Sequence, residues 1–190
     1  MTNAALSAAR SVLVLVDYQA RLLPAIHRAE QVLAEATRLA DAARELGIRV
    51  VATEQNPAGL GPNVDAIRQR CASTLAKIHF DACEDGLLDL LGRDPATGDA
   101  EVADVVIAGC EAHVCLLQTA LGLLRAGRRV WVVAPACGSR SAADHDLAMQ
   151  RLRQAGAVIA STEMVVFEWL HACTHPRFKP VLGLVKTKIE

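Results

Sequence analysis

Asp17, Lys77 and Cys115 are of types that can do chemistry, and Cys115 is the most informative of them. Cys115 lies between a buried-strand pattern at Asp104 to Gly109 and an apolar helix pattern at Leu116 to Arg125. A thiol at a helix start faces unpaired backbone N–H groups and the positive end of the helix dipole. We therefore expect its pKa to fall from about 8.5 into the range of roughly 3.5 to 7.5 that activated cysteines show, which makes Cys115 a candidate nucleophile.

Asp17 and Lys77 are the candidate partners of this thiol. Asp17 follows a run of five apolar residues, at the edge of a low-dielectric core, where a raised pKa would let it act as a base and then as an acid. A helix N-cap is the structural alternative for Asp17. Lys77 lies in a short apolar run, where a snorkelling surface lysine is the commoner outcome, but an ammonium that reached Cys115 would stabilise its thiolate. His113, two residues before the cysteine, raises a Cys–His dyad as the rival arrangement.

The elements that must position these side chains alternate between strands and helices. This alternation predicts an α/β fold of three layers, α/β/α and Rossmann-like, with a mainly parallel sheet of five or six strands. In such sheets the ligand crevice lies at the carboxyl ends of the strands, where Asp17 and Cys115 fall. The expected strands are Val12 to Asp17, Ile48 to Thr53, Asp104 to Gly109, Arg129 to Ala134 and Ala157 to Ser161, with a weaker sixth candidate at Leu75 to Ile78. The expected helices are Ala29 to Leu46, Leu116 to Arg125, Ala142 to Ala155 and Thr162 to His171.

Local signals mark several boundaries of these elements. Gly47, Gly127 and Gly156 stand where three of the helices should end, which is a C-cap signal. Ser141 with Asp144 three residues later predicts a capping box at a helix start. Loops are expected at 56–63 and 93–98, and the proline-containing tail at 174–190 is expected to pack on a neighbour.

The overall composition restricts the classes of partner. The chain has 190 residues, of which 52% are hydrophobic and 22% charged, and this suits a single domain with a well-filled core. Its 20 basic and 21 acidic residues are well mixed and only 3% of residues are aromatic, so we expect no nucleic-acid partner. No apolar leader or bilayer-length run is found, so we expect no membrane partner and a cytoplasmic location. The nearly all-apolar helix from Leu116 to Leu124 favours a homo-oligomer, because such a helix must be buried.

These features together resemble the isochorismatase-like cysteine hydrolase superfamily, and within it the isochorismatase domain-containing proteins. The likeness runs from about Val12 to His171. The residues that carry it are Asp17, Lys77 with Phe80 three residues later, and the runs GCEAHVC at 109–115, TEQNPAGLG at 53–61 and ACGSRS at 136–141. The resemblance implies one hydrolase domain over residues 1–190 and an Asp-Lys-Cys triad made of Asp17, Lys77 and Cys115.

The resemblance also implies a mechanism and a pocket. In the family's usual reaction the aspartate takes the thiol proton, the thiolate attacks a carbonyl-type carbon, and the resulting thioester is hydrolysed. A non-proline cis peptide is expected at Cys110-Glu111, orienting the N–H groups of Glu111 and Cys115 as an oxyanion hole. The pocket lining is expected to comprise Gln19, Gln55, Phe80 and Glu111.

Departures from the family pattern bear on cofactors. Nicotinamidases carry an Asp-x-His metal motif after the second strand, whereas this chain reads ATEQN at 52–56, so we expect no metal and no other cofactor. Asp81, where relatives often have a small residue, leaves the polarity of the pocket open.

The leading hypothesis is therefore a cysteine-dependent hydrolase of a small molecule, acting on an amide, ester or related C–N or C–O bond. The alternative is a non-catalytic oligomeric scaffold or partner-binding module with the same fold. A Rossmann nucleotide binder is disfavoured, because Asp17 to Arg21 stands where a G-x-G-x-x-G run would follow the first strand.

Overall fold

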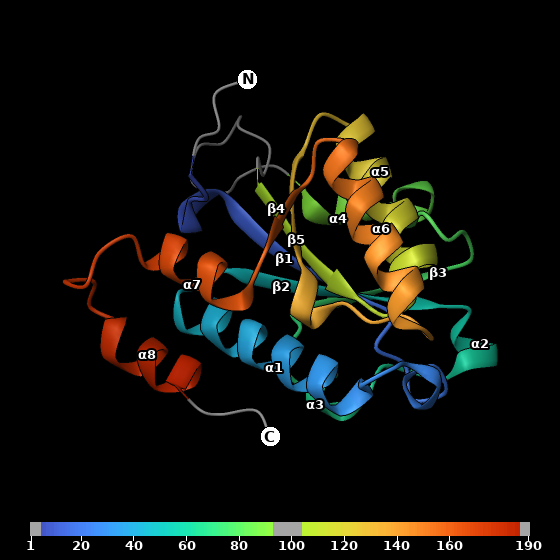
Figure 1. Ribbon diagram of the computed structural model, residues 1–190, viewed down its shortest axis with the longest axis horizontal. Helices are drawn as coiled ribbons and strands as arrows, with labels where there is room; N and C mark the ends of the chain where they lie inside the picture. Colours follow the sequence, from blue (N-terminus) through green and yellow to red (C-terminus); the bar gives the residue numbers. More distant parts are fainter. Residues whose placement is uncertain (1–4, 93–103, 187–190) are drawn as a thin grey trace.

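The computed structural model describes residues 5–92 and 104–186, and these form a parallel six-stranded sheet between two layers of helices (Figure 1). The order of the strands across the sheet is β3-β2-β1-β4-β5-β6. The strands are β1 (Ser11–Val16), β2 (Arg49–Gln55), β3 (Ser73–Lys77), β4 (Asp104–Gly109), β5 (Arg129–Val133) and β6 (Val158–Ala160). The predicted α/β/α fold and parallel sheet are confirmed, and the weaker sixth strand candidate is β3.

The central strands are apolar along their whole length because helices cover both faces of the sheet. Five of the six residues of β1 and all six of β4 are buried, and β1 pairs in register with β4 from Ser11 opposite Asp104 to Val16 opposite Gly109. A Cβ on Gly109 would lie 2.6 Å from the Val16 backbone oxygen, so only glycine allows the two strands to end this close together. The strand order reverses between β1 and β4, which makes their carboxyl ends the topological switch point of the sheet.

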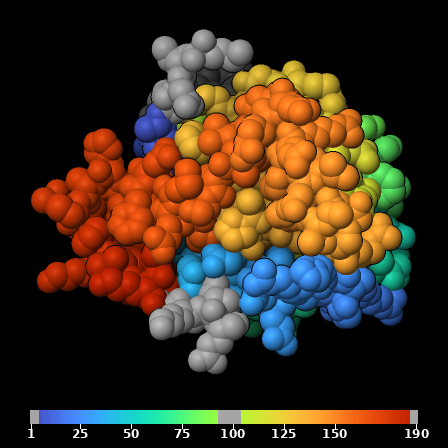
Figure 2. Space-filling model, in the orientation of Figure 1, coloured from blue at the N-terminus to red at the C-terminus, as the bar shows by residue number. Residues whose placement is uncertain are grey.

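The helices divide between the two faces of the sheet. Helix α1 (Ala29–Glu45) packs with α3 (Asp65–Arg68), α7 (Thr162–Leu170) and α8 (Phe178–Lys186) on one face, and α5 (Leu117–Arg125) packs with α6 (Ala142–Gln154) on the other (Figure 1). The short helices α2 (Pro57–Leu60) and α4 (Leu87–Leu91) lie in the β2–β3 and β3–β4 connections. The surface in Figure 2, which has the orientation of Figure 1, is formed mainly by α1, α6, α7 and α8.

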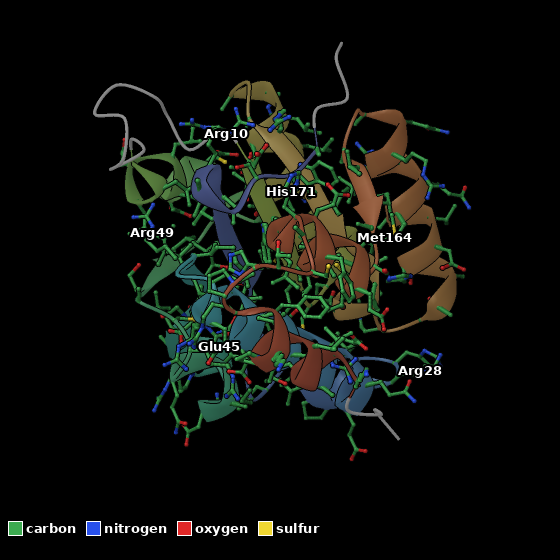
Figure 3. The ribbon with its side chains drawn as sticks, turned by 90° about the vertical axis from the view of Figure 1, so that its left-hand side faces the viewer. Arg10, Arg28, Glu45, Arg49, Met164 and His171 are labelled. Atoms are coloured by element: carbon green, nitrogen blue, oxygen red, sulfur yellow. The ribbon has the colours of Figure 1, made fainter. Side chains whose placement is uncertain are left out.

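Figure 3 shows the molecule from the left-hand side of Figure 1 and labels residues near the ends of several elements. Arg10 and Arg49 mark the amino ends of β1 and β2, with Glu45 at the end of α1 on the same side. Arg28 and Met164 lie at the starts of α1 and α7, and because these helices follow β1 and β6 in the chain, both starts are near the carboxyl edge of the sheet. Candidate ligands must therefore approach from the side of Arg28.

The predicted helix boundaries hold to within one residue for α1, α5, α6 and α7. The N-cap half of the predicted capping box is confirmed, since the Ser141 hydroxyl accepts a hydrogen bond from the Asp144 backbone N–H at 3.1 Å and donates one to the Asp144 carboxylate at 2.8 Å. Gly47, Gly127 and Gly156 follow α1, α5 and α6 with positive φ values, as C-cap glycines do. The tail forms α8 and packs on α1 of the same chain, and the loop expected at 93–98 lies outside the described residues. Among the described residues no helix is both long and apolar enough to span a bilayer.

Candidate active site

Asp17 and Lys77, which are 60 positions apart in the sequence, meet at the carboxyl edge of the sheet. Asp17 directly follows β1 and Lys77 is the last residue of β3, and β2 lies between these two strands. The Lys77 Nζ lies 2.9 Å from Asp17 Oδ2, and both side chains are 0% exposed. The Asp17 Oδ1 accepts a hydrogen bond from the hydroxyl of Thr53 on β2 at 2.6 Å. The alternatives of a helix N-cap for Asp17 and a snorkelling surface role for Lys77 are therefore excluded.

Gln55, the last residue of β2, connects this ion pair to the surrounding backbone. Its side-chain oxygen accepts from Lys77 Nζ at 2.6 Å, and its side-chain nitrogen donates to the Ile78 carbonyl at 2.6 Å. The Gln19 amide pairs with the Gln55 backbone N–H and carbonyl at 2.9 and 3.0 Å and also donates to the Gly61 carbonyl. Gln19 and Gln55 are buried and fully engaged, so they position Lys77 and the loop after β2.

The Cys115 thiol approaches the Asp17–Lys77 ion pair from the β4 side of the sheet. It lies in a single π-helical turn, Ala112–Leu116, which joins β4 to α5. The thiol is directed at the Gln55 side-chain oxygen, with a sulfur–oxygen distance of 3.8 Å, and Asp17 and Lys77 are near enough to influence its pKa. The residue itself is only 3% exposed. The acid after β1, the ammonium at the end of β3 and the sulfur in the turn after β4 therefore converge at the carboxyl edge of the sheet.

The environment of the thiol corrects one prediction. Burial raises the pKa of the Cys115 thiol to about 12, the Asp17 carboxylate adds to the increase, and the Lys77 ammonium opposes it. The expected fall in pKa was wrong because the π turn begins at Ala112 and places Cys115 inside it, so its sulfur faces packed side chains and a carboxylate. The resting sulfur is a neutral thiol, and it needs a base to become a nucleophile.

The segment before the thiol corrects a second prediction. The described residues contain no cis peptide bond, so the cis bond expected at Cys110-Glu111 was wrong. The chain turns here because Glu111 adopts the left-handed conformation with φ of 51°. Hydrogen bonds hold both sides of this turn, from the Cys110 N–H to the Val16 carbonyl at 2.9 Å and from the Ala112 N–H to the Gly138 carbonyl at 2.8 Å. Within the described part of the chain, the N–H of Glu111 between them has no hydrogen-bond partner.

The two other expected pocket residues lie at the rim. Phe80 is 49% exposed and follows Lys77 by three residues, and Glu111 is partly buried in an ion pair with Arg140 at 3.3 Å. His113 contacts the Ser139 hydroxyl at 3.0 Å and Arg140 at 3.2 Å, so its ring nitrogens are occupied away from the thiol. This geometry disfavours the Cys–His dyad.

Two contributors were missed from the sequence. Thr53 is a buried polar residue on β2, and its position two residues before Gln55 is the signal that could have revealed it, because alternate strand residues share a face. Thr119 of α5 donates to the Phe80 carbonyl at 3.2 Å and accepts from the Ala82 N–H at 3.1 Å, which ties the segment after Lys77 to the helix that follows Cys115. No local pattern indicates this contact.

Two cavities are formed by the described residues. One of about 490 Å³ lies between the start of α1 and residues 134–146, and another of about 330 Å³ is lined by His113, Asp81 and the outer face of α5. Cys115 lines neither of them. Over the described ranges, no group of three or more His, Cys, Asp or Glu side chains is placed to hold a metal ion.

Comparisons with known proteins place this arrangement in a family. The model of the isochorismatase domain matches residues 11–164. The chain belongs to the isochorismatase domain family. Isochorismatase domain-containing protein 2A of Mus musculus is 34% identical over 94% of this chain and 84% of that protein, and isochorismatase domain-containing protein 2 of Homo sapiens is 36% identical over 93% and 83%. A solved structure described as the MAR1 ribonuclease of Caenorhabditis elegans superposes with a TM-score of 0.89 at 33% identity, covering 98% of this chain and 95% of that chain. Membership of this family supports a hydrolase.

Proposed function

We propose that this isochorismatase-family protein is a cysteine hydrolase that cleaves an amide, ester or related C–N or C–O bond of a small molecule through a covalent thioester. The observation that carries the proposal is the buried Asp17–Lys77 ion pair, 2.9 Å between charged atoms, with the Cys115 thiol beside it. Strand ends from three positions in the sequence supply a base, a cation and a nucleophile in one water-poor site.

In the first step Asp17 removes the thiol proton as the sulfur attacks the carbonyl carbon. The proton transfer must accompany the attack, because a thiol with a pKa of about 12 is not ionised at neutral pH. Asp17 Oδ2 forms no hydrogen bond of good geometry within the described residues, so a lone pair beside the Lys77 contact is free to take the proton. We assign the stabilisation of the developing oxyanion to the N–H groups of Glu111, which precedes the π turn, and of Cys115, which lies within it.

The tetrahedral intermediate collapses when its C–N or C–O bond breaks and Asp17 gives the proton to the leaving amine or alcohol. The acyl group then remains on Cys115 as a thioester. Water attacks the thioester carbon, Asp17 takes a proton from that water, and the thiol leaves with the proton as the carboxylic acid is released. Lys77 balances the charge of Asp17 while that carboxylate is ionised, and it balances the negative charge of the intermediate while Asp17 holds the proton, which accounts for a buried lysine in this position.

The test is a panel of small esters and amides, with turnover and an acyl adduct read by intact mass. Wild-type protein should gain the mass of one acyl group, and Cys115→Ala should gain none and lose turnover by at least about 10³-fold, as expected when a nucleophile is removed. Cys173→Ala is the matched control, because this thiol is exposed and should be dispensable. Undiminished turnover by Cys115→Ala would end the proposal, and absence of both turnover and adduct with every substrate would favour the scaffold alternative.

A ribonuclease activity is the competing candidate, because the Caenorhabditis elegans relative is described as one. The charged atoms at the site disfavour it, since the Lys77 ammonium is fully buried and already held by Asp17 and Gln55, so it does not face a phosphate. Incubation with a labelled RNA decides the matter. RNA cleavage that persists in Cys115→Ala would reject the thioester mechanism for that activity.

We also propose that the protein associates with itself. Ile78 and Phe80, on either side of His79, are 69% and 49% exposed, and they offer an apolar surface on which a second copy could pack. A hydrolase from Escherichia coli with this fold is described as an octamer, at 23% identity. Light scattering on the purified protein measures the subunit number, and a monomer at micromolar concentration would contradict the proposal.

A further inference from the structure

A charged cluster at the rim of the site surrounds the turn that precedes the nucleophile. Glu111 Oε1 lies 3.3 Å from Arg140 Nε, and the second oxygen of the same carboxylate lies 3.9 Å from the His113 ring. The His113 ring is held in turn by Ser139 and by a second nitrogen of Arg140. Glu111 is largely buried, with 13% of its side chain exposed, whereas Arg140 is 61% exposed.

This cluster and the Asp17–Lys77 ion pair both disfavour a negatively charged substrate. The groups that act on the thiol are one carboxylate, one ammonium and one neutral amide, so their charges cancel. At the rim, the Glu111 carboxylate compensates the Arg140 guanidinium. A carboxylate-bearing substrate would have to leave water for a site whose cations already have anionic partners, and such a transfer is costly.

We propose that the site selects uncharged acyl substrates over those that carry a carboxylate near the cleaved bond, and that Glu111 sets this selectivity by masking the charge of Arg140. The inference rests on the proposed hydrolase function and adds to it the chemical class of the substrate. Glu111 thus has a side-chain role in specificity that is separate from the backbone N–H of the same residue. Without its carboxylate, Arg140 would become an unpaired cation at the rim and would attract anions.

A pair of alkylating reagents that differ in charge tests this directly. Iodoacetamide and iodoacetate both form a carbon–sulfur bond with the cysteine and release iodide, but only iodoacetate is anionic. The rates are followed at Cys115 by peptide fragmentation, with the exposed Cys173 of the same chain and free glutathione as references. In wild-type protein we expect the iodoacetate-to-iodoacetamide rate ratio at Cys115 to be at least about tenfold below that of glutathione, a difference of about 1.4 kcal/mol.

Two substitutions separate the rim pair from general effects on folding. Glu111→Gln should raise the ratio at Cys115 by at least about fivefold, because it exposes the charge of Arg140, and Arg140→Gln should leave the ratio low or reduce it further. A wild-type ratio equal to that of glutathione, or a ratio unchanged in Glu111→Gln, would overturn the inference. If the Glu111→Gln protein does not fold, the Arg140→Gln variant alone tests the inference. A rate ratio at Cys115 that rises in this variant would overturn it.

The proposed hydrolase function is read separately in the same preparations, from the acyl adduct formed by an uncharged ester at Cys115. An adduct together with no charge discrimination rejects only the selectivity. Charge discrimination at the thiol without any adduct or turnover supports the rim assignment and rejects hydrolysis.

Discussion

Replacing Lys77 with methionine removes one charge of a fully buried ion pair while keeping most of the volume of the side chain. The Asp17 carboxylate would then keep its Thr53 hydrogen bond but lose its counter-charge, and the Gln55 side-chain oxygen would lose the donor that lies at 2.6 Å. Asp17→Asn makes the converse change and leaves the Lys77 ammonium buried without an anion. The double variant carries neither charge.

The expected loss of unfolding free energy follows from the distance between the two charges and from their burial. Two unit charges 2.9 Å apart attract by about 6 kcal/mol at an effective dielectric constant of about 20. Desolvation of each ion costs several kcal/mol, so the pair as a whole contributes little to stability, but losing one partner costs about 3–5 kcal/mol. We expect each single variant to lose about that much free energy of unfolding, and the double variant to lose at least about 2 kcal/mol less than the sum.

Urea unfolding, followed by circular dichroism for the wild type and the three variants, measures this double-mutant cycle. The coupling should change little when the salt concentration rises from 0.05 to about 0.5 M, because both side chains are inaccessible to solvent. Turnover should be lost in all three variants, the double variant included, although it is the one that regains stability. Additive losses, or single losses below about 1 kcal/mol, would show that these charges do not form a buried pair and would refute the reasoning.

Two further predictions concern packing and protonation. A Cβ on Gly122 of α5 would lie 2.3 Å from the Asp81 carboxylate, so Gly122→Ala should lower the free energy of unfolding by about 1–3 kcal/mol. Gly183→Ala on α8 is its control, since nothing lies within 4 Å of that Cβ, and thermal melts should show it neutral or stabilised by up to about 1 kcal/mol. Because the pKa of Cys115 is raised to about 12, its rate of alkylation should rise about tenfold per pH unit from pH 7 to 10. A plateau below pH 9 in the mass-resolved rates would mean that the thiol ionises more easily than its burial implies.

The sequence by itself determined the elements and their order. Apolar runs such as β1 and β4, the Ser141 capping box and the glycines after α1, α5 and α6 are local signals, and each is decided by residues within a few positions of one another. The parallel sheet followed from their alternation. Asp17 and Cys115 were placed at strand and helix ends by the same local reasoning.

Tertiary structure alone decided how these side chains interact. Whether Lys77 reaches solvent or Asp17 depends on β2 and β3 pairing in register, which is a contact between distant segments. The pKa of Cys115 depends on the π turn and on the burial it creates, and the conformation of Glu111 depends on hydrogen bonds to residues 16 and 138 on either side of it. Burial, distance and charge compensation are properties of the packed chain, because desolvation and Coulomb energies depend on surroundings that no short window of sequence contains.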